Sequence, residues 1–327
     1  MIEIESRYRN ALKEYKFIDL FCGIGGFHLA LSSFGAKCVF ASEIDPHAVS
    51  VYKDNFNIEP KGDITKIHAK DIPLHDIICA GFPCQSFSIS GKLNGLDDPN
   101  GQLYKNIVRI AKHHKPKLIL MENVKNLEVH DKRKTLDIIK QDFARAGYKL
   151  FTQVLNASDF GVPQSRQRLY LIAFRKDLAV KEFLFPVGDN RIVSLELVLE
   201  ENPCEQSFVN RDFTLHNNEP SEPVNRLVRI GSIGKGRQGE RIYSRKGHAA
   251  TLSSQGGGLG GRTGMYLVGN RIRKLTTREC ARVMGFPEKF KIADKPSTCY
   301  NQFGNSVVVD VLQEILKCAV AFLKGGI

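Results

Sequence analysis

Cys84 is the residue best placed for nucleophilic chemistry. It lies in the segment Ala80-Gly81-Phe82-Pro83-Cys84-Gln85, directly after an apolar run that predicts a buried strand. A cysteine on a tight turn beyond a sheet edge is accessible, and nearby backbone N–H groups can lower its pKa. A single cysteine is more often structural than catalytic, so a catalytic role for Cys84 requires partners elsewhere in the chain.

Two further motifs supply such partners. Glu122-Asn123-Val124 ends another predicted strand, 38 residues after Cys84, and Gln164-Ser165-Arg166-Gln167-Arg168 precedes a third. Arg166 and Arg168 are two residues apart, so in an extended chain they point to the same side. Each motif alone is typical of a surface ion pair. Together they suggest a nucleophile, a carboxyl group and a guanidinium over one pocket.

A glycine-rich turn predicts a ligand site near the start of the chain. Asp19-Leu20-Phe21-Cys22-Gly23-Ile24-Gly25-Gly26 joins a predicted strand to a helix whose free N–H groups face the turn. His28 stands where the dinucleotide fingerprint needs its third glycine, which disfavours a nicotinamide cofactor. Glu43, 20 residues after Gly23, can accept the ribose hydroxyl protons, and Asp63 can bind an adenine amino group. Because no Walker lysine is present to hold phosphates, S-adenosylmethionine is the leading cofactor.

Short apolar runs alternate with amphipathic stretches from Lys16 to Phe174. This alternation predicts an α/β fold with a mostly parallel sheet, in which ligands lie beyond the carboxyl ends of strands. The expected strands are residues 17–21, 38–41, 76–80, 118–121 and 169–174. The expected helices are residues 26–34, a segment from about 45, and residues 103–112, 135–146, 277–284 and 307–322.

The rhythm of strands and helices stops after Pro186. Twelve glycines lie between Gly231 and Gly269, which predicts a small domain of loops and short strands. The expected domains are a catalytic and cofactor-binding domain over residues 1–190 and a target-recognition domain over residues 191–285. Residues 286–327 are expected to return to the catalytic domain, with the apolar final helix packed on it.

Composition indicates a protein that binds a polyanion. The chain has 327 residues, 42% of them hydrophobic and 25% charged, and a net charge of +12. The stretch from Ser221 to Cys280 contains twelve Lys or Arg and three Glu. Its net charge is therefore +9, which is most of the net charge of +12 of the whole chain. The eight cysteines are scattered, which argues against zinc, other metals and disulfides. No signal peptide or transmembrane run is recognisable, and we expect a cytoplasmic protein without a membrane partner.

The ordered motifs resemble those of bacterial DNA cytosine-5 methyltransferases of the restriction–modification type, with an HhaI-like layout. The resemblance extends from Phe17 to about Val307 and includes the four motifs quoted above. Two more follow, Arg278-Glu279-Cys280-Ala281-Arg282-Val283-Met284-Gly285-Phe286-Pro287 and Gly304-Asn305-Ser306-Val307. Each motif is modest alone, but all six in this order are highly specific. The resemblance implies a Rossmann-like, S-adenosylmethionine-dependent sheet with a smaller, loop-rich DNA-recognition domain.

The resemblance also implies roles for individual residues. Cys84 would attack C6 of a cytosine flipped out of the duplex, Glu122 would act at N3, and Arg168, with Arg166 nearby, would hold O2. The residues implied at S-adenosylmethionine, or its product S-adenosylhomocysteine, are Phe21, Gly23, Ile24, Gly25, Gly26, Glu43, Ile44, Asp63, Ile64, Pro83, Leu103, Asn305, Ser306 and Val307. Ile44 departs from the family, which often has an aromatic residue there. The residues implied at DNA are Gln85, Ser88, Ser90, Lys92, Arg237, Gln238, Arg241, Tyr243, Thr251, Ser253, Gln255 and Gly257, of which Ser90 and Gln238 would fill the space left by the flipped base.

The implied partners are double-stranded DNA, with GCGC as the suggested site, and a cognate restriction endonuclease encoded with the enzyme. We expect a nucleoid-associated monomer, because each strand can be methylated separately. Three alternatives remain: an RNA cytosine methyltransferase, a basic DNA-binding regulator without catalysis, and a nicotinamide oxidoreductase. RNA-acting relatives lack the glycine-rich segment and carry a Cys-Phe-Thr motif, which is absent here.

Overall fold

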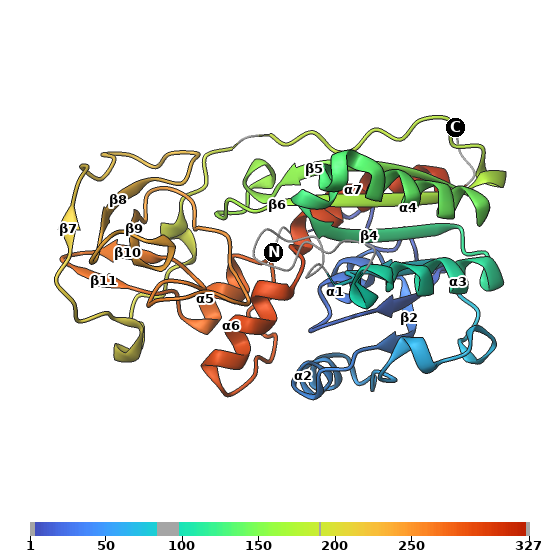
Figure 1. Ribbon diagram of the computed structural model, residues 1–327, viewed down its shortest axis with the longest axis horizontal. Helices are drawn as coiled ribbons and strands as arrows, with labels where there is room; N and C mark the ends of the chain where they lie inside the picture. Colours follow the sequence, from blue (N-terminus) through green and yellow to red (C-terminus); the bar gives the residue numbers. More distant parts are fainter. Residues whose placement is uncertain (1–3, 84–97, 190, 325–327) are drawn as a thin grey trace. The chain divides into compact units, whose positions relative to one another are not determined.

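The computed structural model describes residues 4–83, 98–189 and 191–324 (Figure 1). The chain divides into two compact units. The sheet unit comprises Glu3–Leu155, Gln167–Pro186 and Leu312–Ile327, and the recognition unit comprises Met1–Ile2, Asn156–Arg166 and Val187–Val311. Cys84, Gln85, Ser88, Ser90 and Lys92 lie outside the described residues.

The sheet unit contains a six-stranded sheet in the order β2-β1-β3-β4-β6-β5. Its first four members are parallel, and β6 runs antiparallel to β4. The α/β fold with a largely parallel sheet is therefore confirmed. The strands are β1 (Lys16–Leu20), β2 (Lys37–Ser42), β3 (Ile77–Ala80), β4 (Leu118–Val124), β5 (Tyr148–Asn156) and β6 (Gln167–Arg175).

Helices cover both faces of this sheet. Successive residues of a strand point to opposite sides, so these apolar strands present apolar side chains on both faces. On one face, Ile18 and its neighbours form a core with Ile107 of α3 (Tyr104–His114) and Ile139 of α4 (Lys134–Arg145). On the other face, Phe174 packs against Phe322 of α7 (Val309–Leu323) at a ring-centroid distance of 5.4 Å. The Tyr15 hydroxyl also donates to the Leu323 carbonyl at 2.6 Å. The final helix thus packs on the sheet unit.

A buried aromatic cluster fixes α1 (Gly26–Ser33) and α2 (Pro46–Phe56) beside β1. The imidazole of His28 stacks on Phe56 at 3.9 Å between centroids and meets the edge of Phe17 at 5.3 Å. Its Nδ1 is hydrogen-bonded to the Tyr52 hydroxyl at 2.7 Å. Burial lowers the pKa of His28 to about 4, which favours the neutral ring.

The recognition unit contains a five-stranded sheet in the order β11-β10-β9-β8-β7, with helices after it. Its small core includes Ile230, Ile242, Met265 and Ile272. The elements are β7 (Thr214–Leu215), β8 (Arg229–Ser232), β9 (Arg241–Ser244), β10 (Met265–Val268), β11 (Arg271–Arg273), α5 (Thr277–Arg282) and α6 (Pro296–Asn305).

A buried ion pair holds α5 to this sheet. Arg273 donates to both carboxylate oxygens of Glu279 at 2.8 and 2.7 Å, and both side chains are at most 1% exposed. The same carboxylate accepts the N–H groups of Thr276 at 2.8 Å and Glu200 at 2.7 Å. The carboxylate is thereby surrounded by donors, as a buried charge requires, whereas the Arg273 Nε has no hydrogen-bond partner among the described residues.

The compact units differ from the predicted domain boundaries, most extensively in two segments. Residues 156–166 and 286–311 belong to the recognition unit by their contacts. One physical reason is that Gln164 forms a β-bridge with Ala249, deep in the glycine-rich part of the chain. The functional division into residues 1–190, 191–285 and 286–327 stays a prediction. Within the described residues, no helix is long and apolar enough to cross a membrane.

The buried histidine gives a testable pH dependence. In the unfolded chain His28 takes up a proton near its ordinary pKa of 6.5, whereas in the fold the pKa is about 4. The contribution of the neutral ring to stability is therefore complete above pH 6.5 and is lost as the pH falls toward 4, up to about 3 kcal/mol. Urea unfolding at pH 7 and pH 4.5 should show a smaller pH effect for His28→Phe than for wild type. His47→Gln, at an exposed position on α2, is the control and should keep the wild-type dependence; an unchanged dependence in His28→Phe would contradict this account.

Candidate active site

The antiparallel pairing of β6 with β4 brings a guanidinium to a carboxylate. Glu122 lies two residues before the end of β4, and the register places Val124 opposite Arg168. The Arg168 Nε lies 3.2 Å from a Glu122 carboxylate oxygen, and the two side chains are 16% and 10% exposed. Arg168 also donates to the Gln167 carbonyl at 2.8 Å, which fixes its orientation. The predicted pairing of these two side chains is therefore present.

The turn after β3 is tied to the same strand end. The Asn123 side-chain amide donates to the Phe82 carbonyl at 3.1 Å, and its oxygen accepts the Val124 N–H at 2.9 Å. Asn123 is 1% exposed. Pro83, half-buried, is the last described residue before the segment that carries Cys84. The turn leading to the predicted nucleophile is thus anchored beside Glu122.

The glycine-rich turn after β1 is strained. Phe21 has φ 53°, in the left-handed region that non-glycine residues rarely adopt, and Gly23 and Gly25 have φ 52° and 89°. A Cβ at Gly25 would lie 2.2 Å from a ring carbon of Phe56, so only glycine fits there. The turn ends at Gly26, where α1 begins with N–H groups free of helical partners.

Glu43, which directly follows β2, faces this turn. Its carboxylate accepts the Gly23 N–H at 2.8 Å, and it also accepts the N–H groups of Ile44 at 2.8 Å and Asp45 at 3.0 Å. A carboxylate has roughly four acceptor positions, so three are filled by backbone donors and one stays available. The side chain of Ile44 is 74% exposed beside it.

Asp63 presents a second carboxylate after β2 and α2. One of its oxygens accepts both the N–H and the hydroxyl of Thr65, at 3.0 and 2.8 Å. These hydrogen bonds lower the pKa of Asp63, so the group is a charged acceptor. Ile64 is buried, and Leu103, at the start of α3, is half-buried. The carboxylates of Glu43 and Asp63 are acceptors suited to the hydroxyl and amino groups of an adenosine.

Asp19 is a buried carboxyl group beneath the glycine-rich turn, and its position was not predicted to matter. It is fully buried, and burial, followed by repulsion from Glu43, raises its pKa well above the usual range. The His28 N–H and the Tyr52 hydroxyl face it and partly offset this rise, but neither oxygen makes a hydrogen bond of normal geometry. A neutral carboxylic acid is the form that this environment favours.

Most of the described cysteines are buried. Burial raises the pKa of the thiols of Cys22, Cys38, Cys79 and Cys280, the second of them to about 12. Among the described cysteines only Cys204 is exposed. A thiol that stays protonated is a poor nucleophile, so none of the four buried groups competes with Cys84 for a catalytic role. The described residues contain no cluster of His, Cys, Asp or Glu able to hold a metal ion.

The two arginines of the third motif have different partners. Arg166 precedes β6 and is 2% exposed, with hydrogen bonds to the carbonyls of Leu252, Gly304 and Ser306 at 3.0, 3.1 and 2.6 Å. The predicted cofactor residues after α6 differ in exposure: Asn305 is exposed, Ser306 is half-buried and Val307 is buried.

Most described residues predicted to meet DNA lie at the surface of the recognition unit. Arg237, Gln238, Thr251, Gln255 and Gly257 are exposed, whereas Ser253 and Arg241 are half-buried. Tyr243 differs, because it is 7% exposed with its ring 6.0 Å from that of Tyr266.

Glycines hold the two recognition loops against each other. The Gly260 N–H donates to the Gly239 carbonyl at 2.9 Å, and a Cβ at Gly239 would lie 1.9 Å from the Gly257 oxygen. The loop of Gln238 and the loop of Gln255 are therefore in backbone contact.

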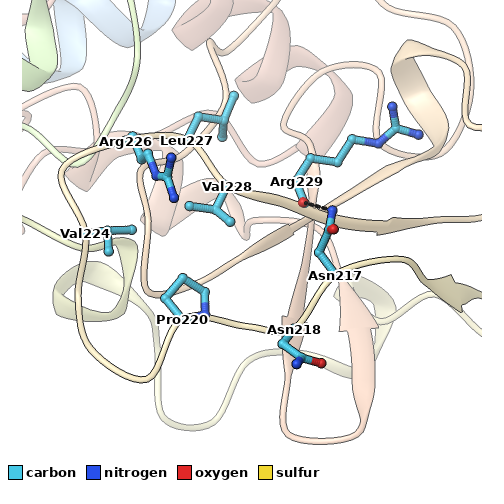
Figure 2. A pocket seen from close by; sticks show the side chains of 8 residues that line it. All are labelled: Asn217, Asn218, Pro220, Val224, Arg226, Leu227, Val228 and Arg229. Carbon is cyan, nitrogen blue, oxygen red and sulfur yellow. Dashed lines mark hydrogen bonds between the residues drawn. The ribbon is translucent and has the colours of Figure 1, made fainter.

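Two arginines of the recognition unit are paired within the chain. Arg271 pairs with Glu205 and lies over the Phe208 ring at 3.8 Å, and Arg245 lies 3.3 Å from Glu196. A separate depression of about 500 Å³ is lined by the chain from Asn217 to Arg229, which leads from β7 into β8 (Figure 2). Its polar lining includes Asn217, Asn218, Arg226 and Arg229, and none of them was predicted as a site residue.

Comparison with known proteins identifies the family. The profile of the C-5 cytosine-specific DNA methylase family matches residues 15–320. Type II methyltransferase M.HhaI of Haemophilus parahaemolyticus is 49% identical over 318 residues, which cover 96% of each chain. Type II methyltransferase M.HaeII of Haemophilus aegyptius is 40% identical and covers 93% of this chain and 92% of its own. The solved structure of the Entamoeba histolytica methyltransferase EhMeth matches with a TM-score of 0.71 at 18% identity, over 93% of this chain and 97% of that one, which shows the shared fold.

These matches span the sheet unit and the recognition unit together, and they exclude the nicotinamide oxidoreductase alternative. The chain belongs to the C-5 cytosine-specific DNA methylase family and is a DNA cytosine-5 methyltransferase of the restriction–modification type.

Proposed function

We propose that this enzyme flips a cytosine out of duplex DNA and methylates C5 through a covalent adduct between Cys84 and C6. The observation that carries the proposal is the ion pair of Glu122 and Arg168 at 3.2 Å, beside the turn that leads to Cys84. Asn123 ties that turn to the strand of Glu122 through the Phe82 carbonyl at 3.1 Å. A carboxylate, a guanidinium and a thiol on neighbouring strand ends are what cytosine activation needs.

The chemistry assigns one task to each side chain. The Cys84 thiolate adds to C6, which makes C5 electron-rich, while Glu122 holds a proton at N3. Arg168 binds the cytosine O2 and orients Glu122. C5 then takes the methyl group, a base removes the C5 proton, and the C5–C6 double bond re-forms as the Cys84 sulfur leaves.

The proposed methyl donor is S-adenosylmethionine, which supplies an electrophilic methyl group on a sulfonium. Glu43 would bind the ribose. One ribose hydroxyl would donate to the remaining acceptor position of the Glu43 carboxylate. The second hydroxyl would donate to a carboxylate oxygen that also accepts a backbone N–H. Asp63 would accept from the adenine amino group, with Phe21 and Ile44 against the ring. The residues proposed around the rest of the donor are Gly23, Ile24, Gly25, Gly26, Ile64, Pro83, Leu103, Asn305, Ser306 and Val307.

Flipping is required because the target ring is inaccessible inside the duplex. Ser90 and Gln238 would fill the vacated space, and the exposure of Gln238 supports this role. The backbone contact between Gly239 and Gly257 supports a recognition surface built from both loops. The remaining DNA contacts proposed are Gln85, Ser88, Lys92, Arg237, Arg241, Thr251, Ser253, Gln255 and Gly257. Tyr243, being buried, would act by supporting β9.

The biological role follows from the type of enzyme. We propose that methylation at GCGC protects host DNA from a partner restriction endonuclease, because the two relatives named above are type II methyltransferases. The enzyme would act at the nucleoid as a monomer.

Bisulfite sequencing tests the function and the target together. A plasmid from a methylation-free host that expresses this chain should show protected cytosines at one short site, with GCGC expected. Methylation at another site would replace the proposed target but keep the function. An unmethylated plasmid, despite abundant folded protein, would instead support a DNA-binding regulator without catalysis.

Cys84→Ser tests the covalent step. The wild-type enzyme should form a denaturation-resistant complex with a duplex that carries 5-fluorocytosine at the target, because fluorine blocks removal of the C5 substituent. Cys84→Ser should form no such complex, as measured by gel shift under denaturing conditions. Cys204→Ser alters an exposed cysteine of the recognition unit and should trap normally. A trapped complex with Cys84→Ser would show that another group is the nucleophile.

A further inference from the structure

Arg166 links two segments that the proposed function assigns to different ligands. One of its guanidinium nitrogens, Nη1, donates to the Leu252 carbonyl at 3.0 Å, next to Thr251 and Ser253 of the proposed DNA surface. The other, Nη2, donates to the Ser306 carbonyl at 2.6 Å, in the segment proposed to line the methyl donor. Arg166 is 2% exposed, so it reaches these segments rather than solvent.

Gln164 completes the hold on the recognition loop. Its side-chain oxygen accepts the Leu252 N–H at 3.2 Å, so two side chains of one short segment bind both backbone groups of Leu252. The amide nitrogen of Gln164 donates to the Val283 carbonyl at 2.8 Å. In addition, the Thr251 hydroxyl donates to the Ser165 carbonyl. The start of the loop is therefore fixed on the Gln164–Arg166 segment.

A direct backbone contact joins the same two segments. A Cβ at Gly304 would lie 2.1 Å from the Ser254 nitrogen and 2.3 Å from the Ser253 carbonyl carbon. The last turn of α6 and the recognition loop thus touch where no side chain fits. Because Gly304 immediately precedes Asn305 and Ser306, a shift of the loop displaces this segment unless the contact opens.

We propose that Arg166 is a positioning residue that couples DNA binding to binding of the methyl donor, through its joint hold on Leu252 and Ser306. This inference rests on the proposed function, which places DNA at residues 251–257 and the donor at residues 305–307. It replaces the catalytic role that the sequence suggests for Arg166, because its guanidinium contacts the protein backbone. Arg168 keeps the contact with the reacting ring.

The coupling has a defined thermodynamic form. If DNA orders the recognition loop, the Ser306 carbonyl is already held in place before the donor binds. Donor binding then costs less conformational entropy, because residues 305–307 are already ordered. By linkage, the donor must tighten DNA binding by the same factor. A coupling carried by packed, hydrogen-bonded elements is typically about 5- to 150-fold.

Calorimetry with S-adenosylhomocysteine measures this factor. Its dissociation constant is determined for the whole enzyme alone and for the enzyme saturated with a duplex that carries the methylated site. For the wild type, saturation with the duplex should tighten the binding of S-adenosylhomocysteine about fivefold or more. Saturation with S-adenosylhomocysteine should tighten the binding of the duplex by the same factor. Arg166→Lys keeps the charge but loses the planar fork, and its factor should fall to within twofold of one.

Two further variants separate coupling from loss of structure. Gly304→Ala leaves Arg166 intact but forces the loop away from α6, and it should also lower the factor. Arg282→Lys is the matched control, because Arg282 in α5 of the same unit donates to the Val198 carbonyl at 3.0 Å and pairs with Glu288. It should keep the wild-type factor.

The outcomes are distinct. A wild-type factor retained in Arg166→Lys and Gly304→Ala, or lost equally in Arg282→Lys, would overturn the proposal. A wild-type enzyme that binds both ligands without coupling would overturn it as well. Wild type that binds neither ligand would contradict the proposed function itself.

Discussion

The reversal of one strand, β6, within an otherwise largely parallel sheet is the constraint on which the proposed chemistry depends. Parallel strands β1, β3 and β4 carry their loops to one edge, which collects the glycine-rich turn, the turn before Cys84, and Glu122. Only a neighbour that runs the other way can return a side chain to that edge at its first residues. β6 does so, and Arg168 therefore meets Glu122 at 3.2 Å. The ion pair is partly buried, where charge interactions are stronger than in water.

Close backbone contact is the second organising feature. In the recognition unit, glycines allow backbones to touch at two places: Gly239 meets Gly257 between two loops, and Gly304 of α6 meets Ser254. Loops built this way bury little apolar surface, so buried polar side chains must fix them. Gln164 and Arg166 do this for the loop at Leu252, and the pair of Arg273 and Glu279 does it for α5. The proposed recognition surface therefore depends on the same hydrogen bonds that hold these loops in place.

Much of the sheet unit could be predicted from the sequence, because its buried strands are short apolar runs between turn residues. β5 and α6 were missed. β5 is an edge strand with a mostly half-exposed pattern, and α6 is polar, with only Cys299, Gln302, Phe303 and Gly304 buried. Neither has the apolar periodicity that identifies a buried element.

The sequence predicts which residues form the candidate site, but it does not predict all of their hydrogen-bond partners. Glu122 and Arg168 were paired correctly, because both flank strand ends. The partners of Arg166 lie 86, 138 and 140 residues away, and no spacing rule reveals a hydrogen bond to a distant backbone carbonyl. Asn123 and Gln164 lie within recognised motifs, but their roles depend on tertiary contacts. The burial of Asp19 could be inferred from its place in a strand, but its raised pKa could not.

The central claim is that Glu122 and Arg168 act on the cytosine as one unit. A double-mutant cycle tests it most directly, with single-turnover methyl transfer measured at saturating DNA and donor for wild type, Glu122→Gln, Arg168→Lys and the double variant. The account predicts that the double variant loses about tenfold less rate than the product of the two single losses, a coupling of about 1.4 kcal/mol. Losses that simply multiply would show that the two side chains act independently and would contradict the account.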